Sequence, residues 1–69
     1  MIKKIELERA LYKIGYHIIT SFEKVSSFIQ RCMVEVDGAD EFPPSVIKDV
    51  AYSMLDVELE KELMKVLGI

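Results

Sequence analysis

Apolar residues recur every three or four positions through the first half of the chain. This spacing averages close to the period of an α-helix, about 3.6 residues, and predicts one helix from about residue 3 to residue 36. Polar residues occupy the opposite face, as expected for a helix that is buried along one side. The apolar stripe consists of Leu7, Leu11, Ile14, Ile18, Phe22, Val25, Ile29, Met33 and Val36.

Gly15 lies inside this predicted helix and is the residue most able to interrupt it. A break normally shifts the phase of an apolar stripe, and the stripe keeps its phase across Gly15. The pattern therefore favours a continuous helix, in which glycine costs about 1 kcal/mol relative to alanine. The alternative is a kink near Gly15 or near Thr20 and Ser21, which would give two shorter helices.

A turn-forming segment, VDGADEFPPS, spans residues 36–45 and separates the two halves. Asp37-Gly38 can reverse the chain, and Pro43-Pro44 cannot continue a helix but suits the start of the next one. The second apolar stripe predicts a helix over residues 44–67, with Gly68 as its C-terminal cap. A bend is the alternative here, with Asp56 capping a third helix from 57 to 67.

These elements predict an all-α fold, in which residues 1–69 form a single domain built as an antiparallel helical hairpin. The shorter second helix would leave residues 2–12 as an overhang with an exposed apolar face. A second copy of the hairpin would cover it, which predicts a dimeric four-helix bundle. The alternative is a three-helix monomer. The predicted interface residues are Ile5, Leu7, Leu11, Tyr12, Gly15 and Tyr16.

The composition strengthens the expectation of a partner. A core in a chain of 69 residues rarely supplies more than about 3–5 kcal/mol without disulfides, a metal or association. One cysteine allows no internal disulfide, and a single histidine excludes a zinc site built on Cys/His spacing. No cofactor is predicted. Signal-peptide and membrane-spanning patterns are absent from the sequence, so we expect a cytoplasmic protein.

Two side chains that could take part in catalysis, His17 and Cys32, lack the neighbours that catalysis needs. No carboxylate stands one helical turn from His17, and Cys32 lies beside the apolar stripe, where a thiol is buried and inert. Phosphate-binding and nucleophile-elbow motifs are also missing. The sequence therefore predicts a protein that is not an enzyme.

The remaining hypotheses are both binding functions. The first is a protein–protein interaction module that self-associates, serving as a small adaptor, regulator or assembly subunit. The alternative is a small nucleic-acid-binding regulator that contacts phosphates through a sparse basic row on the first helix. The net charge of −3 and the acidic second half disfavour this alternative. The basic row consists of Arg9, Lys13, Lys24 and Arg31.

Overall fold

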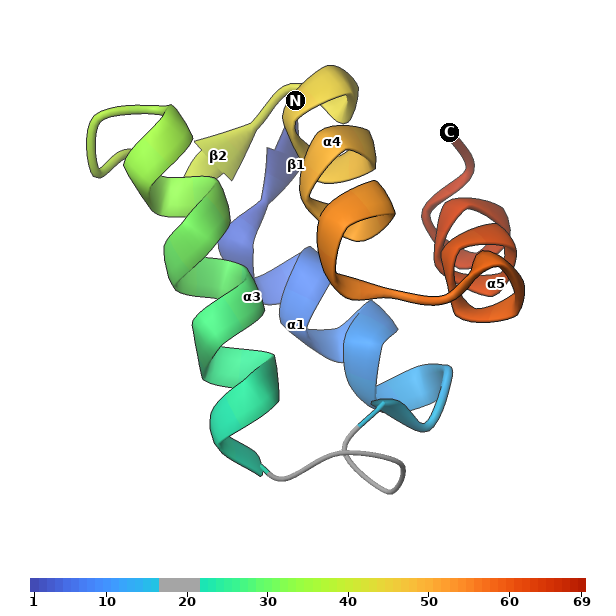
Figure 1. Ribbon diagram of the computed structural model, residues 1–69. Helices are drawn as coiled ribbons and strands as arrows, with labels where there is room; N and C mark the ends of the chain where they lie inside the picture. Colours follow the sequence, from blue (N-terminus) through green and yellow to red (C-terminus); the bar gives the residue numbers. More distant parts are fainter. Residues whose placement is uncertain (17–21) are drawn as a thin grey trace.

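The chain is mostly helical, as the sequence predicts, but it also contains a small two-stranded sheet that the sequence pattern does not indicate. A computed structural model describes residues 1–16 and 22–69, with the side chain of Phe22 excepted. Figure 1 shows the elements in chain order. They are β1 (Ile2–Lys3), α1 (Lys4–Lys13), α3 (Phe22–Glu35), β2 (Glu41–Phe42), α4 (Pro44–Met54) and α5 (Val57–Leu67).

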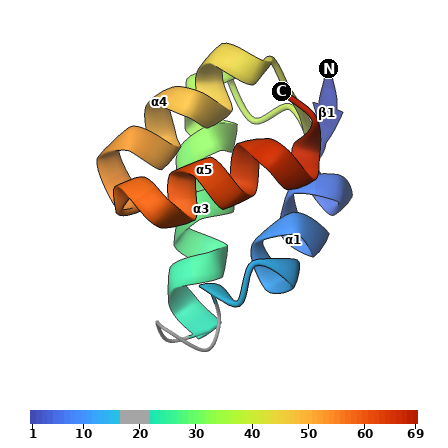
Figure 2. The same ribbon diagram turned by 90° about the vertical axis from the view of Figure 1, so that its right-hand side faces the viewer.

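The four helices within residues 1–16 and 22–69, α1, α3, α4 and α5, form a closed ring of contacts around one core. Helix α1 packs against α3 and α5, and α4 packs against the same two helices from the other side. In Figure 2, α4 and α5 lie in front of α3. Strands β1 and β2 pair antiparallel, with Ile2 opposite Phe42 and Lys3 opposite Glu41, and so connect the start of the chain to its middle.

The continuous first helix is a wrong prediction, and the break near Gly15 is confirmed. Helix α1 ends at Lys13, with Ile14 as its C-cap. Gly15 has a φ of +79°, in the left-handed region that favours glycine. Its N–H donates to the Tyr12 carbonyl over 3.0 Å. The alternative kink at Thr20 and Ser21 lies outside the described residues.

Because Gly15 has a positive φ, the sign of the stability change caused by a substitution there distinguishes a break from a continuous helix. Gly15→Ala is expected to lower the free energy of unfolding by about 1–2 kcal/mol, because an L-residue is strained in the left-handed region. No atom lies within 4 Å of the added Cβ, so the backbone conformation alone causes this loss. In a continuous helix the same change would instead stabilise by about 1 kcal/mol. The midpoint of urea unfolding measures the difference, and D-alanine at position 15 should not lower it.

The second half also contains two helices, which overturns the single helix over 44–67 and confirms the bend at Asp56. Leu55 is extended, with a φ of −109° and a ψ of 153°, and this conformation ends α4. The Asp56 carboxylate then caps α5 by accepting a hydrogen bond from the Leu59 N–H over 2.8 Å. Gly68, at φ +73°, is the predicted C-terminal cap.

The predicted overhang does not exist, because residues 2–12 belong to the chain's own core. Leu7 and Leu11 are fully buried, and Ile2 and Tyr16 are nearly so. Helices α3 and α5 cover α1 in the way that the second copy was expected to do. The buried apolar residues are Ile2, Leu7, Ala10, Leu11, Tyr16, Val25, Phe28, Ile29, Cys32, Phe42, Ile47, Val50, Ala51, Leu55 and Leu63.

Half of the residues predicted to form an interface belong to this core. Leu7, Leu11 and Tyr16 are not available to a second copy, so their assignment to an interface is wrong. Ile5, at 49% exposure, and the half-buried Tyr12 and Gly15 remain at the surface. The fold is therefore neither the hairpin nor the three-helix monomer, because in the described part of the chain four helices close around the core within a body of 28 × 24 × 20 Å. The dimeric bundle stays a prediction.

None of the helices in the described part of the chain has the length and the apolar character that crossing a bilayer requires.

Candidate functional site

A groove runs between α1 and α3 on the surface of the molecule. Its central hollow has a volume of about 330 Å³. Buried Val25 and Ile29 and half-buried Met33 of α3 form its apolar side, and half-buried Tyr12 of α1 faces them. The polar lining residues are Lys4, Glu8, Ser26 and Gln30.

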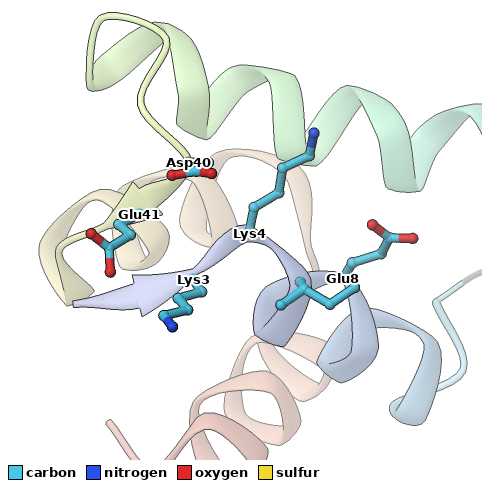
Figure 3. Close-up of a pocket in the computed structure, with 6 residues that line it drawn as sticks. Lys3, Lys4, Glu8, Asp40 and Glu41 are labelled. Atoms are coloured by element: carbon cyan, nitrogen blue, oxygen red, sulfur yellow. The ribbon is translucent and has the colours of Figure 1, made fainter.

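Toward the turn between α3 and β2, the central hollow continues into two adjoining hollows. Lys4 and Glu8 also line a hollow of about 480 Å³ over the β1–β2 pair (Figure 3). Gln30 and Met33 also line a hollow beside the turn at Asp37 and Gly38. We call these three hollows together the α1–α3 groove. Its further lining residues are Lys3, Ile5, Val34, Asp40 and Glu41.

The spacing of residues along both helices explains why the groove is open. On α3, Ser26, Gln30 and Met33 follow each other at helical intervals and lie beside the buried ridge of Val25 and Ile29. Two of these three side chains are polar, so the flank that faces α1 is not filled by apolar packing. Shared lining of the central hollow places this flank opposite Lys4, Glu8 and Tyr12.

Large apolar side chains are exposed at the end of the groove next to the turn between α3 and β2. Ile5 is 49% exposed beside the β1–β2 pair, and Val34 is 73% exposed beside the turn that follows α3. Together with half-buried Tyr12 and Met33 they give the groove a row of accessible apolar contacts. An exposed apolar surface bordered by polar residues is typical of a protein-binding site.

The charged residues of the groove are mostly acidic. Four carboxylates belong to its lining, and only two lysines, Lys3 and Lys4, oppose them. The acidic end is held in place by the backbone, because the Lys4 N–H donates to the Asp40 carbonyl oxygen over 2.7 Å. In Figure 3, Lys4 and Glu8 extend from α1 on the side that faces α3. The carboxylates are those of Glu8, Asp37, Asp40 and Glu41.

The basic row predicted for nucleic acid is divided into two separate pairs. Arg9 and Lys13 lie on the flank of α1 that faces α5, where they line a hollow with Val66 and Leu67. Lys24 and Arg31, seven residues apart, lie on the flank of α3 that is turned away from the α1–α3 groove. The two pairs therefore do not form one continuous phosphate-binding surface.

Of the two side chains considered for catalysis, only Cys32 lies within the described residues. His17 lies outside the described residues. Cys32 is fully buried, as the sequence predicts, and burial, together with the nearby Glu35 carboxylate, raises the pKa of its thiol to about 12. Within residues 1–16 and 22–69, no group of three His, Cys, Asp or Glu side chains is arranged to hold a metal ion.

Cys32 should react slowly with thiol reagents in the native protein. At pH 8 we expect reaction with an aromatic disulfide to be at least about a hundredfold slower than in concentrated guanidinium, because the thiolate is the nucleophile. The raised pKa also favours the folded state below about pH 9, and this contribution is lost as the pH rises toward 12. Equal rates with and without denaturant would show that the thiol is accessible.

No protein-family model, no curated protein and no solved structure matches this chain. Its function is therefore inferred from the residues and the geometry of the α1–α3 groove. Sequence reasoning had identified Ile5 and Tyr12 as interface residues, and both line this groove. It missed Val34 and the acidic residues around the turn. The available signal for Val34 was its apolar side chain, which lies outside the apolar stripe near the end of the first predicted helix.

Proposed function

We propose that the protein is a non-enzymatic protein–protein interaction module that binds its partner through the α1–α3 groove. The observation that supports this proposal is the exposure of Ile5 and Val34 near one end of a groove whose middle is apolar. Aromatic residues and methionine are enriched in binding surfaces, and Tyr12 and Met33 are both accessible here. The flexible Met33 side chain can adapt to the shape of a partner.

A protein other than a second copy is the partner that this geometry supports. The reason for self-association was an uncovered apolar overhang, and the chain covers those residues itself. The α1–α3 groove is a concave surface, which fits a protruding segment better than it fits an identical groove. The roles of adaptor, regulator and assembly subunit are all compatible with such a module.

Nucleic-acid binding is not retained as a second proposal. It required Arg9, Lys13, Lys24 and Arg31 to act on one ligand, and the two pairs lie on different flanks of different helices. The groove itself has an excess of carboxylates, which would repel a phosphate backbone.

Site-specific photocrosslinking in the source cells tests the proposed function. A benzophenone side chain placed at position 34 or at position 5 should trap a partner protein. The matched control is position 52, because Tyr52 is 82% exposed on the outward face of α4. A product at positions 34 and 5 and not at 52 supports the groove as the binding surface. Equal products at all three positions, or none at 34 and 5, would overturn it.

A further inference from the structure

We propose that the α1–α3 groove binds a basic amphipathic helix, about three turns long, belonging to a different protein. This inference rests on the proposed function and specifies the chemistry of its partner. It is carried by the shape of the groove, by the chemistry of its walls and by the sign of the charges that border it.

The walls of the groove favour a helical occupant over an extended one. Helices line both sides of the central hollow, and their backbone N–H and C=O groups bond within their own helices. An extended peptide would find few backbone partners there and would bury unpaired polar groups. A helical peptide satisfies its own backbone and offers only side chains, which is how amphipathic helices bind apolar grooves elsewhere.

The length of the groove sets the length of its occupant. The lining residues on α3 and the following turn extend from Val25 to Asp37. At 1.5 Å per residue these positions span about 18 Å, which matches about three turns of a helix in the partner. Exposed Ile5 and Val34 lie at the end of this span next to the turn, and half-buried Tyr12 lies toward its other end. A partner with apolar residues at every third or fourth position can therefore contact both ends.

The charge of the border selects the charge of the occupant. Four carboxylates and two lysines line the groove, and the whole chain has a net charge of −3. Asp37 and Asp40 in the turn between α3 and β2, and Glu41 at the start of β2, are all exposed. Lysine or arginine side chains of a bound helix can reach them there. Complementary charge of this kind accelerates association and excludes partners of the wrong sign.

Synthetic peptides of about fourteen residues test this inference directly, since that length covers three helical turns and both ends. The basic peptide has leucine at positions spaced three and four apart and lysine elsewhere. The first control peptide replaces every lysine with glutamate, and the second is a scrambled basic peptide without an apolar face. The basic amphipathic peptide should bind at least about tenfold more tightly than either control. Its affinity should fall as the salt concentration rises.

The methionine methyl groups provide a readout that locates the bound peptide. With 13C-methyl methionine, the NMR signal of Met33 should shift on addition of the basic peptide, because Met33 lines the groove. Met54 of α4 and Met64 of α5 serve as internal controls, since they pack against the core from other helices. Shifts confined to Met54 or Met64 would place the peptide elsewhere and overturn the inference.

Charge reversal distinguishes a specific groove from general attraction. The double variant Asp40→Lys and Glu41→Lys changes two exposed side chains, and far-UV circular dichroism verifies that it stays folded. It should bind the basic peptide at least about tenfold more weakly and gain affinity for the acidic one. The matched control, Glu58→Lys with Glu62→Lys on exposed positions of α5, makes the same change in net charge and should keep the original preference. Equal losses in both double variants would overturn the inference.

The outcomes also separate this inference from the proposed function. Crosslinking at positions 34 and 5 to a partner that lacks a basic helix would leave the groove as a binding surface and overturn only the identity of its occupant. A crosslinked product with twice the mass of the chain would identify a second copy as the occupant instead. Failure of both the crosslinking and the peptides to involve the groove would overturn both.

Discussion

Replacing Leu11 with glutamate is expected to abolish cooperative folding of the chain. Leu11 is 0% exposed and belongs to the core that α1 shares with α3 and α5. An unpaired charge at such a site costs several kcal/mol, which is comparable to the whole stability of about 3–5 kcal/mol expected for a core of this size. Thermal unfolding followed by far-UV circular dichroism should show no cooperative transition and little helix at room temperature.

The control for this prediction is Tyr52→Glu, which makes the same type of change at a side chain that is 82% exposed. This variant should unfold within about 0.5 kcal/mol of the native protein. The decisive contrary outcome is a Leu11→Glu variant that stays helical while its mass in solution falls. That result would place Leu11 in a subunit interface and restore the overhang that the fold excludes.

Truncating Phe42 to alanine is expected to remove most of the stability of the fold. Phe42 is fully buried although it lies in the segment between two helices, and it pairs with Ile2 in the β1–β2 sheet. Phenylalanine-to-alanine changes in protein cores cost about 3–5 kcal/mol, because apolar contact is lost and a cavity remains. Urea unfolding measures this loss.

Phe42→Leu is the matched variant, because it keeps an apolar side chain in the same space and should lose less than half as much. If both variants unfold at the same urea concentration as the native protein, the segment between α3 and α4 does not contribute to the core. The β1–β2 pair would then lie on the surface without stabilising the fold, and it would not connect residues 2–3 to the core.

Several elements of the fold could be predicted because their signals are local. The helical period, the proline pair at the start of α4, the Asp56 cap and Gly68 each depend on residues within one turn of the feature that they determine. These features need no knowledge of which elements meet in space.

Other features depend on contacts between distant residues, which the pattern alone does not reveal. A stripe that keeps its phase across Gly15 does not require one continuous helix, because α1 and α3 each present an apolar face to the same core. Strands of two residues are too short to show alternation, so β1 and β2 exist only through their pairing with each other. The α1–α3 groove likewise arises where two helices meet, so it could not be predicted from the sequence of either helix alone.

The closed ring of helices has a consequence for how the chain is made. Leu11 in α1 and Leu63 in α5 are both fully buried in one cluster, yet α3, β2 and α4 lie between them in the sequence. A ribosome releases the first helix well before its cover has been synthesised, so nascent chains carry an uncovered apolar face. Chains that stop before α5 should therefore be recognised by chaperones and degraded, and only chains that include α5 can close the ring.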